Sequence, residues 1–236
     1  MAINSQIRGN SLIDGIAKAD LDSIGPHISL VHLGHNEVIC EPGSIVDYVF
    51  FPTQSILSVI TLMEDGQGVE ACTIGHESAH GLLHALGSSI AVDRVIAQVP
   101  GSCLKLPSVK LKAAAAASPH LTELIIRHVQ ANVAQIQQSV ACNALHHVEA
   151  RLCRWLLMSQ DRMTNGKLPL TQEFLGYMLG VQRTTVTGAA RSLQSAGLIR
   201  YARGQIEILD RAGLEEGACE CYAVVRHKHT QLLAAR

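Results

Sequence analysis

The chain has 236 residues, of which 47% are hydrophobic and 17% are charged, so it is long enough for two domains with ordinary cores. Its net charge is only −1, but residues 1–145 carry a net charge of −5 and residues 146–236 one of +4. This division excludes a uniformly basic nucleic-acid binder. It leaves the C-terminal part as the region suited to a polyanionic partner.

Membrane and secreted classes of protein are not expected either. No apolar run approaches the roughly 18–20 residues that a membrane span needs, and the opening MAINSQIRGN lacks the apolar core of a signal peptide. We therefore expect a cytoplasmic chain with no membrane partner. The cysteines are odd in number and scattered in apolar stretches, which favours reduced, buried thiols over a disulfide framework. They are Cys40, Cys72, Cys103, Cys142, Cys153, Cys219 and Cys221.

The first half of the chain predicts short helices followed by strands. Residues 11–25 have the spacing of one or two short helices. From His27 the pattern changes to short segments rich in β-branched residues, separated by Gly, Pro, Asn or Asp, as in HISLVHLG, YVFFPTQ and RVIAQVPG. Such regular short strands predict an all-β sandwich or barrel over about residues 25–107. Glu64-Asp65-Gly66 is the predicted turn of one hairpin.

A long helix is predicted next. Residues 113–117 are all alanine, Pro119 suits the start of a helix, and apolar residues then recur at mostly three- and four-residue steps to Leu145. A helix of this length is too long to be covered by one small β-domain, which favours a two-helix dimer seam. The alternative is packing wholly on its own domain. The candidate dimerisation residues are Leu121, Ile125, Val129, Val133, Ile136 and Val140.

A further helix is expected over residues 147–163, followed by a loop at Thr164-Asn165-Gly166 and a helix-turn-helix pattern. Thr171 can cap the next helix. Gly180 allows a sharp turn, and a second helix runs from near Gln182 to about Ser195. Leu198–Tyr201 and Gln205–Leu209 then alternate as two short strands around Ala202-Arg203-Gly204, and a capped helix follows Asp210.

The outward face of the second helix carries Arg, Thr and Gln side chains and no acidic residue. Arg183 is expected to read a base, most simply a guanine, with Gln182 flanking it and the threonines contacting bases or phosphates. Arg191 on the helix, and Arg200 and Arg203 on the hairpin, are expected to hold phosphates. The candidate DNA-binding residues are Thr171, Gln172, Gln182, Arg183, Thr184, Thr185, Thr187, Arg191, Arg200 and Arg203.

Three phrases of this chain resemble one large branch of the Crp/Fnr family of bacterial transcription regulators: CNALHHVEARLCRWLLM, LPLTQEFLGYMLGVQRTTVTGAARSLQSAGLIRY and ILDRAGLEEGACECYAVVR. The resemblance implies an α+β fold with a cyclic-nucleotide-binding-like β-roll as sensor (1–118), a long dimerisation helix (119–145) and a winged helix-turn-helix (146–236). It also implies a homodimer on palindromic double-stranded DNA, with RNA polymerase as a further candidate partner. Whether the protein activates or represses is left open.

The sensor departs from the family's cyclic-nucleotide binders, which carry adjacent Gly-Glu and then Arg before a small residue. Here His76 separates Gly75 from Glu77, and Val95 follows Arg94. Gly75, Glu77 and Arg94 remain the candidate effector pocket, because a guanidinium can pair with an anion. Cyclic nucleotide binding is not expected, and no cofactor is required. The N-terminal cysteine cluster of the iron–sulfur oxygen sensors is also missing.

Two rival interpretations stay open. His76, His80 and His84 are spaced four apart and would share a helix face, which keeps a haem- or metal-sensing regulator in view. Interrupting glycines favour partly exposed histidines instead. Cys219 and Cys221 are too close for a zinc clamp and are interpreted as helix packing, and His146-His147 as a polar joint, so no metal ligand is predicted. A module that binds no DNA is the other rival. No enzyme signature is present, and no catalytic residue is predicted.

Overall fold

The computed structural model describes residues 7–163 and 167–234, and it divides into two compact units. The first unit comprises Met1–Val59, Ile74–Val133 and His229–Arg236, and the second comprises Ile60–Thr73 and Ala134–Lys228. The loop predicted at Thr164-Asn165-Gly166 lies outside the described residues. None of the described helices is both long enough and apolar enough to cross a membrane.

Two short helices open the first unit, as predicted. They are α1 (Ser11–Asp14) and α2 (Lys18–Ile24), and a single 3-10 turn (Gly25–His27) follows. Asn10 caps α1, because its side-chain oxygen accepts hydrogen bonds from the backbone N–H groups of Leu12 and Ile13.

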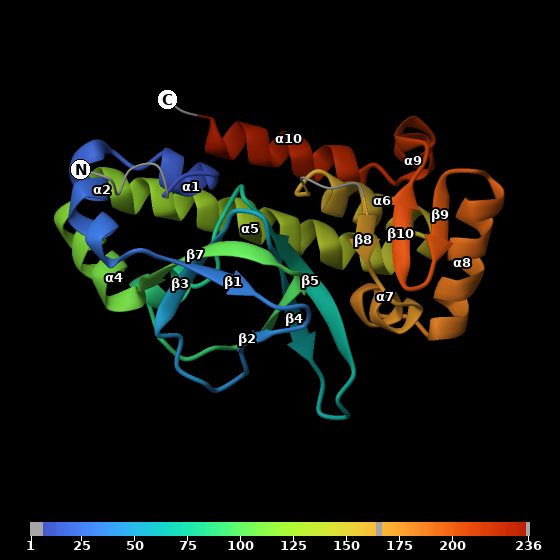
Figure 1. Cartoon of the computed structure of the whole chain (residues 1–236), viewed down its shortest axis with the longest axis horizontal. Coiled ribbons are helices and arrows are strands. Elements are labelled where there is room, and N and C mark those ends of the chain that lie inside the picture. Colours follow the sequence, from blue (N-terminus) through green and yellow to red (C-terminus); the bar gives the residue numbers. More distant parts are fainter. Residues whose placement is uncertain (1–6, 164–166, 235–236) are drawn as a thin grey trace. The chain divides into compact units, whose positions relative to one another are not determined.

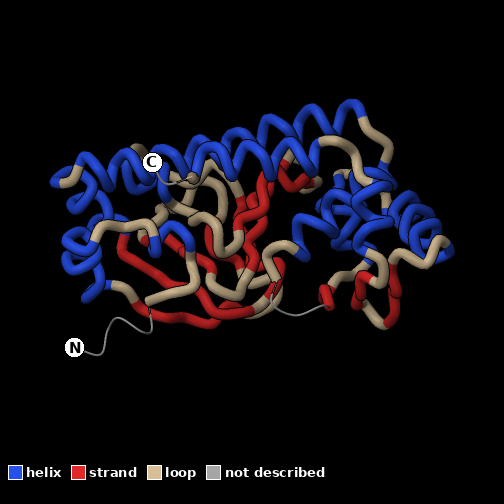
Figure 2. Tube along the Cα trace, turned by 90° about the horizontal axis from the view of Figure 1, so that it is seen from above, coloured by secondary structure: helices blue, strands red, loops and turns tan. Residues whose placement is uncertain are grey.

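Seven short strands follow, and they form two sheets (Figure 1; in Figure 2 the strands are red). A three-stranded sheet has the order β1-β7-β3, and a four-stranded sheet has the order β2-β6-β4-β5. The hairpin between β4 and β5 turns at the predicted place, with Gly66 at φ +83°. The strands are β1 (Ser29–Leu33), β2 (Val38–Cys40), β3 (Tyr48–Pro52), β4 (Ile56–Leu62), β5 (Gly68–Ile74), β6 (Arg94–Val99) and β7 (Gly101–Pro107), with the short helix α3 (Leu82–Leu86) between β5 and β6.

The core of the first unit joins its helices to its sheets. Side chains from α1, α2, β3, α3, β7 and α4 (Ser108–Ala117) pack with the start of α5 (Pro119–Leu145). Ser118 caps α5 by accepting a hydrogen bond from the Leu121 N–H at 3.2 Å, and Pro119 occupies the first helical position, where its missing N–H costs nothing.

The burial of α5 corrects the predicted dimer seam. Leu121 and Ile125 are fully buried in the core of their own unit, so they are not available to a partner helix. Val129 packs against the same core. Val133 and Val140, by contrast, are 40% and 67% exposed. The three- and four-residue spacing in the sequence could not distinguish the inward face of the helix from its outward face.

The second unit contains the remaining elements, drawn from yellow to red in Figure 1. They are α6 (Val148–Gln160), β8 (Lys167–Pro169), α7 (Gln172–Leu179), α8 (Arg183–Ser195), β9 (Ile199–Ala202), β10 (Gln205–Ile208), α9 (Arg211–Gly217) and α10 (Cys221–Leu233), of which the part from His229 belongs to the first unit. The three strands form a sheet in the order β8-β10-β9. The sequence did not predict β8, because a three-residue strand ending in proline leaves no alternating pattern.

The segment Ile60–Thr73, which includes the turn between β4 and β5, belongs to the second unit and is hydrogen-bonded to other residues of that unit. The indole Nε1 of Trp155 donates to the buried carboxylate of Glu70 at 2.6 Å. The amide of Gln135 donates to the carbonyl of Thr73 at 3.0 Å. These bonds satisfy polar groups that would be costly to bury alone.

Replacing Gly180 by alanine is expected to destabilise the second unit by about 1–2 kcal/mol, because a left-handed conformation carries that cost for an L residue. Gly180 has φ +61°, and an added β-carbon would lie 3.0 Å from Val69 Cγ2. Trp155, the only tryptophan, is buried and reports unfolding of this unit in a urea titration.

Gly188→Ala is the matched control, since Gly188 lies inside α8 with no atom within 4 Å of an added β-carbon. That variant should be about 0.5–1 kcal/mol more stable than the parent. Identical urea midpoints in all three proteins would contradict the role given to Gly180.

Candidate nucleic-acid interface

The first helix of the helix-turn-helix begins and ends as the sequence predicts. The hydroxyl oxygen of Thr171 accepts a hydrogen bond from the Phe174 N–H at 3.1 Å, and Glu173 lies in the first turn of α7, where negative charge suits the helix dipole. Gly180 ends the helix in the left-handed region. This residue redirects the chain from α7 to α8.

A buried arginine fixes the end of the same helix. The guanidinium of Arg151, on α6, donates hydrogen bonds to the carbonyl of Leu179 and to the side-chain oxygen of Asn143, the latter at 2.8 Å. The Leu179 carbonyl is among those that a helix end leaves without an internal partner. Burial lowers the pKa of Arg151, so these acceptors stabilise a cation that is otherwise costly to bury.

The second helix presents the side chains that the sequence singled out. Val186 and Leu193 are buried, so the opposite face of α8 points outward. Gln182 is the N-cap residue and makes no side-chain cap. The exposed residues of this face are Gln182, Arg183, Thr184, Thr185, Gly188 and Arg191. Among these exposed residues of α8 there is no carboxylate, so this face is suited to contact a polyanion.

Thr187 differs from the other threonines because its hydroxyl is used inside the protein. Its Oγ1 lies 2.8 Å from both the Gln172 side-chain oxygen and the Arg183 carbonyl. A hydroxyl has only one hydrogen to donate. Thr187 and Gln172 therefore position the start of α8 in this structure, and any contact to a base would have to replace these bonds.

The hairpin brings a second set of basic residues. Arg203 and Gly204 form its two-residue turn with φ of +52° and +72°, as a turn of the primed type requires. The strands are shifted slightly from the prediction, to Ile199–Ala202 and Gln205–Ile208. Arg203 is exposed at the tip. Arg200 is paired with Glu207 across the hairpin at 3.2 Å, so a phosphate would have to compete with that carboxylate.

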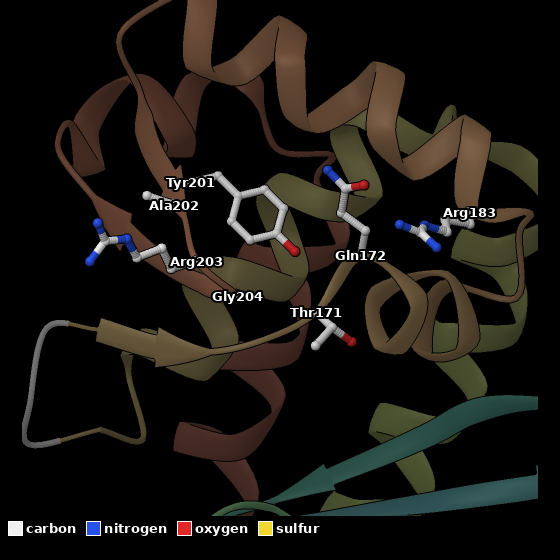
Figure 3. Close-up of a pocket in the computed structure, with 7 residues that line it drawn as sticks. All are labelled: Thr171, Gln172, Arg183, Tyr201, Ala202, Arg203 and Gly204. Atoms are coloured by element: carbon white, nitrogen blue, oxygen red, sulfur yellow. The ribbon is translucent and has the colours of Figure 1, made fainter.

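One surface hollow is lined by basic residues from both α8 and the hairpin, Arg183 and Arg203 (Figure 3). In this view Arg203 and Arg183 lie on opposite sides, and Tyr201 and Gln172 lie between them. The hydroxyl of Tyr201 donates to the Leu170 carbonyl at 3.0 Å. Burial raises the pKa of Tyr201, while the positive charge of Arg183 acts in the opposite direction. The hollow is lined by Thr171, Gln172, Arg183, Tyr201, Ala202, Arg203 and Gly204.

Sequence reasoning missed two residues: one that lines this hollow and one, buried, that supports the turn between α7 and α8. Tyr201 was predicted only as part of a strand, although its ring lies between the two arginines in Figure 3 and lines the hollow. Arg151 was not singled out, because nothing local marks a buried arginine inside an apolar helix. The two arginines in the otherwise apolar phrase RLCRWLLM were the available signal.

The candidate effector residues of the first unit are engaged with other groups. Arg94 donates from Nε and Nη2 to one carboxylate oxygen of Glu41, at 3.0 and 2.6 Å. The carboxylate of Glu77 accepts a hydrogen bond from the Gly75 N–H at 3.2 Å. The guanidinium expected to take an anion therefore already has a carboxylate partner.

The three spaced histidines do not share one exposed helix face. His80 is buried on a bridge to Phe50, its Nε2 lies 3.6 Å from the Cys40 sulfur, and burial lowers its pKa to about 3. His76 and His84 are half-buried. Among the described residues, no cluster able to hold a metal includes them. The expectation of partly exposed histidines is therefore wrong for His80, whose ring is a neutral core group.

Comparison with known proteins identifies this architecture. A family model of the Crp-like helix-turn-helix domain matches residues 150–216. A search of curated proteins gave no match.

Solved structures share the fold over most of the chain. FixK2 from Bradyrhizobium japonicum is 17% identical with a TM-score of 0.69, over 81% of this chain and 98% of that one. A CRP-family transcriptional regulator from Thermus thermophilus is 18% identical with a TM-score of 0.67, over 80% and 96%. The c-di-GMP-responsive global regulator CLP from Xanthomonas campestris is 13% identical with a TM-score of 0.65, over 81% and 99%. Residues 150–216 are thus a Crp-like helix-turn-helix domain, and the chain has the fold of the Crp/Fnr family of transcription regulators.

Proposed function

We propose that the protein is a homodimeric transcription regulator whose two α8 helices enter successive major grooves of a two-fold symmetric DNA site. The observation that carries the proposal is the exposed, carboxylate-free face of α8, whose Arg183 lines the same hollow as Arg203 at the hairpin tip. A helix of about this size fits the major groove, and the half-sites of such dimers lie roughly one helical turn apart.

The roles follow from the side-chain chemistry. Arg183, exposed at the first turn of α8, reads a guanine through paired hydrogen bonds. Thr184 and Thr185, exposed beside it, contact base edges or phosphates. Arg203 at the hairpin tip binds the phosphate backbone, which positions the domain without reading sequence.

Dimerisation is assigned to the outward face of α5. Ile126, Val133 and Val140 follow one another at seven-residue intervals and are 46%, 40% and 67% exposed. Gln130 and Gln137 are exposed between them. This is the spacing of a two-helix seam, in which polar residues at alternate positions fix register at a cost in stability.

Arg183→Ala is expected to weaken binding to the selected DNA site by about 1–3 kcal/mol and to relax the preference at one base pair. The site is obtained by selection from a random-sequence library with the full-length protein, and affinity is measured by fluorescence anisotropy. Arg203→Ala should weaken all sequences alike.

Lys110→Ala, an exposed substitution on α4 outside the hollow, is the control and should bind like the parent. A base-selective loss in Arg203→Ala, or an unchanged base preference in Arg183→Ala, would overturn these two assignments. Parent protein that selects no sequence would favour a module that does not read DNA.

Val133→Asp is expected to convert the dimer to monomer, because a charge cannot be buried unpaired in an apolar seam. Sedimentation velocity measures the state directly. Val109→Asp, at a 70% exposed valine on α4, is the matched control and should stay dimeric. A Val133→Asp protein that sediments as the dimer would place the seam elsewhere.

The sensor unit is proposed not to bind cyclic AMP. The support is the ion pair of Arg94 with Glu41, in which two guanidinium nitrogens donate to one carboxylate oxygen, so an anionic phosphate would have to compete with that carboxylate. The Xanthomonas regulator responds to c-di-GMP, so the same question extends to cyclic dinucleotides. A haem-sensing first unit is the alternative, and a visible absorption band in purified protein would favour it.

Calorimetric titration with cyclic AMP, cyclic GMP and c-di-GMP is expected to give no saturable heat for the full-length dimer. Glu41→Gln, which removes the competing charge, tests whether Arg94 can be released for an anion. Saturable binding by the parent protein that disappears in Arg94→Ala would show that the pocket is a working nucleotide site.

A further inference from the structure

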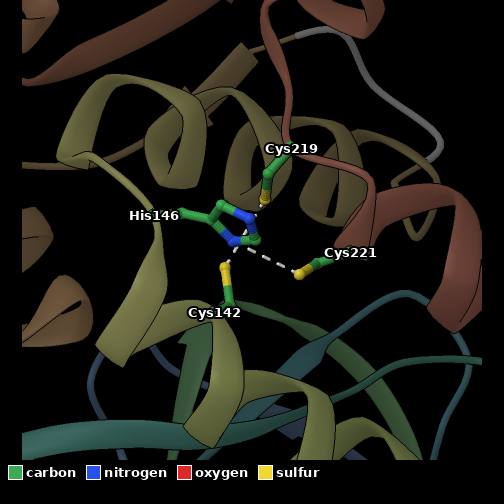
Figure 4. Close-up of side chains that lie close together, drawn as sticks. All are labelled: Cys142, His146, Cys219 and Cys221. Carbon is green, nitrogen blue, oxygen red and sulfur yellow. Dashed lines mark hydrogen bonds between the residues drawn. The ribbon is translucent and has the colours of Figure 1, made fainter.

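Four potential metal ligands from two distant segments meet in the second unit (Figure 4). Cys142 lies in the last turn of α5, and His146 follows directly after the helix ends. The backbone N–H of His146 donates a hydrogen bond to the backbone carbonyl of Cys142 at 3.1 Å. Cys219 lies between α9 and α10, and Cys221, two residues later, is the first residue of α10. Their three sulfurs and one ring nitrogen all lie within 4.8 Å of one another.

We propose that Cys142, His146, Cys219 and Cys221 bind a structural zinc ion. Three cysteines and one histidine are an established ligand set of structural zinc sites. With Zn–S of about 2.3 Å and Zn–N of about 2.0–2.1 Å, a tetrahedral site places two sulfurs roughly 3.8 Å apart and sulfur and nitrogen roughly 3.5 Å apart.

Two of the ligand spacings in the structure are close to these values. The Cys142 and Cys219 sulfurs are 3.5 Å apart, and so are the Cys221 sulfur and His146 Nδ1, while all four ligand atoms lie within 4.8 Å of one another. A disulfide would need about 2.05 Å between sulfurs, so Cys142 and Cys219 are separate thiols.

The orientation of the histidine ring is the second observation. Its Nδ1 faces the Cys221 sulfur, and its Nε2 lies 3.2 Å from a carboxylate oxygen of Glu220. Metal-binding histidines commonly donate their other ring N–H to a carboxylate, which fixes the tautomer and the ring plane. Gln138 supports the same shell, because its amide donates to the Cys221 sulfur at 3.1 Å.

The charge of the surroundings is the third observation. Zinc with three thiolates and a neutral imidazole has a net charge of −1. Arg154 is 6% exposed, and its positive charge acts on both Cys142 and Cys219. Arg151, also buried, interacts with the same two cysteines. An anionic zinc site would compensate cations whose burial is otherwise costly.

The burial of the ligands indicates a structural rather than a catalytic site. Cys142 and Cys221 are 0% and 1% exposed and Cys219 is 8% exposed, and four protein ligands fill a tetrahedral shell with no open position. On binding, three thiols each release a proton to solvent and no electron is transferred. The ion would fix the start of α10 to the end of α5.

The sequence pattern hides this site because no single segment holds a zinc clamp. Cys219 and Cys221 are separated by one residue, and Cys142 and His146 lie far upstream. The Cys142–Cys219 pair is 77 residues apart in the chain. The sequence interpretation of the two C-terminal cysteines as packing considered them without their distant partners.

Zinc content of the full-length protein, purified without a polyhistidine tag and gel-filtered into metal-free buffer, is the first test. Inductively coupled plasma mass spectrometry should find about one zinc per chain. Cys219→Ser and His146→Ala should lose it, whereas His146→Cys should keep it because a fourth thiolate replaces the imidazole. Cys72→Ser is the matched control, since Cys72 is also buried in the second unit but outside the cluster.

Cobalt spectroscopy keeps the test decisive if a variant fails to fold. The parent protein, freed of metal and titrated with Co²⁺, should show the intense visible bands and sulfur charge-transfer bands of a tetrahedral thiolate site. Glu220→Gln should keep the stoichiometry but raise the zinc dissociation constant by about 10–100-fold.

The proposal fails if the zinc-supplied parent retains no metal after gel filtration, or if its cobalt spectrum is that of the hexa-aqua ion. A Cys142–Cys219 disulfide found by mass spectrometry would equally overturn it. DNA binding is not used as a readout, so failure of the zinc site and failure of the proposed function are separately visible.

Discussion

The hydrogen bonds of the buried Arg151 guanidinium fix the junction between α7 and α8, on which the exposed face of α8 depends. Arg151 reaches from α6 to the last carbonyl of α7 and to Asn143 near the end of α5. The chain then turns at Gly180, in a conformation that other residues adopt only at a cost. The direction of α8, and therefore the set of its side chains that faces solvent, follows from this one junction.

The local parts of this arrangement were predictable from the sequence because they rest on near neighbours. A capping threonine, a glycine at the turn and apolar residues at helical spacing are all read within a few residues, and α7 and α8 begin and end close to the predicted positions. The hairpin was predictable for the same reason, since alternation and the Arg203-Gly204 turn are also local.

The parts that were not predictable depend on contacts between distant residues. Leu121 and Val133 both carry apolar side chains on α5, but only the packed fold shows that the first is buried in the core and the second is exposed. Arg94 was a candidate anion ligand until the fold placed Glu41 beside it. Likewise, Cys142 and Cys219 acquire a shared environment only when α5 and the start of α10 are brought together.

The ion pair between Arg200 and Glu207 bears on how the hairpin would respond to ionic strength. Arginines that neutralise phosphates displace condensed counterions, and each displaced ion steepens the fall of affinity with salt. To bind a phosphate, Arg200 would have to leave the carboxylate of Glu207. The freed carboxylate would then attract cations from solution, and this uptake would partly offset the cations released from the DNA. If the hairpin contacts DNA as proposed, Arg200 would contribute less to the net ion release than an arginine without a carboxylate partner.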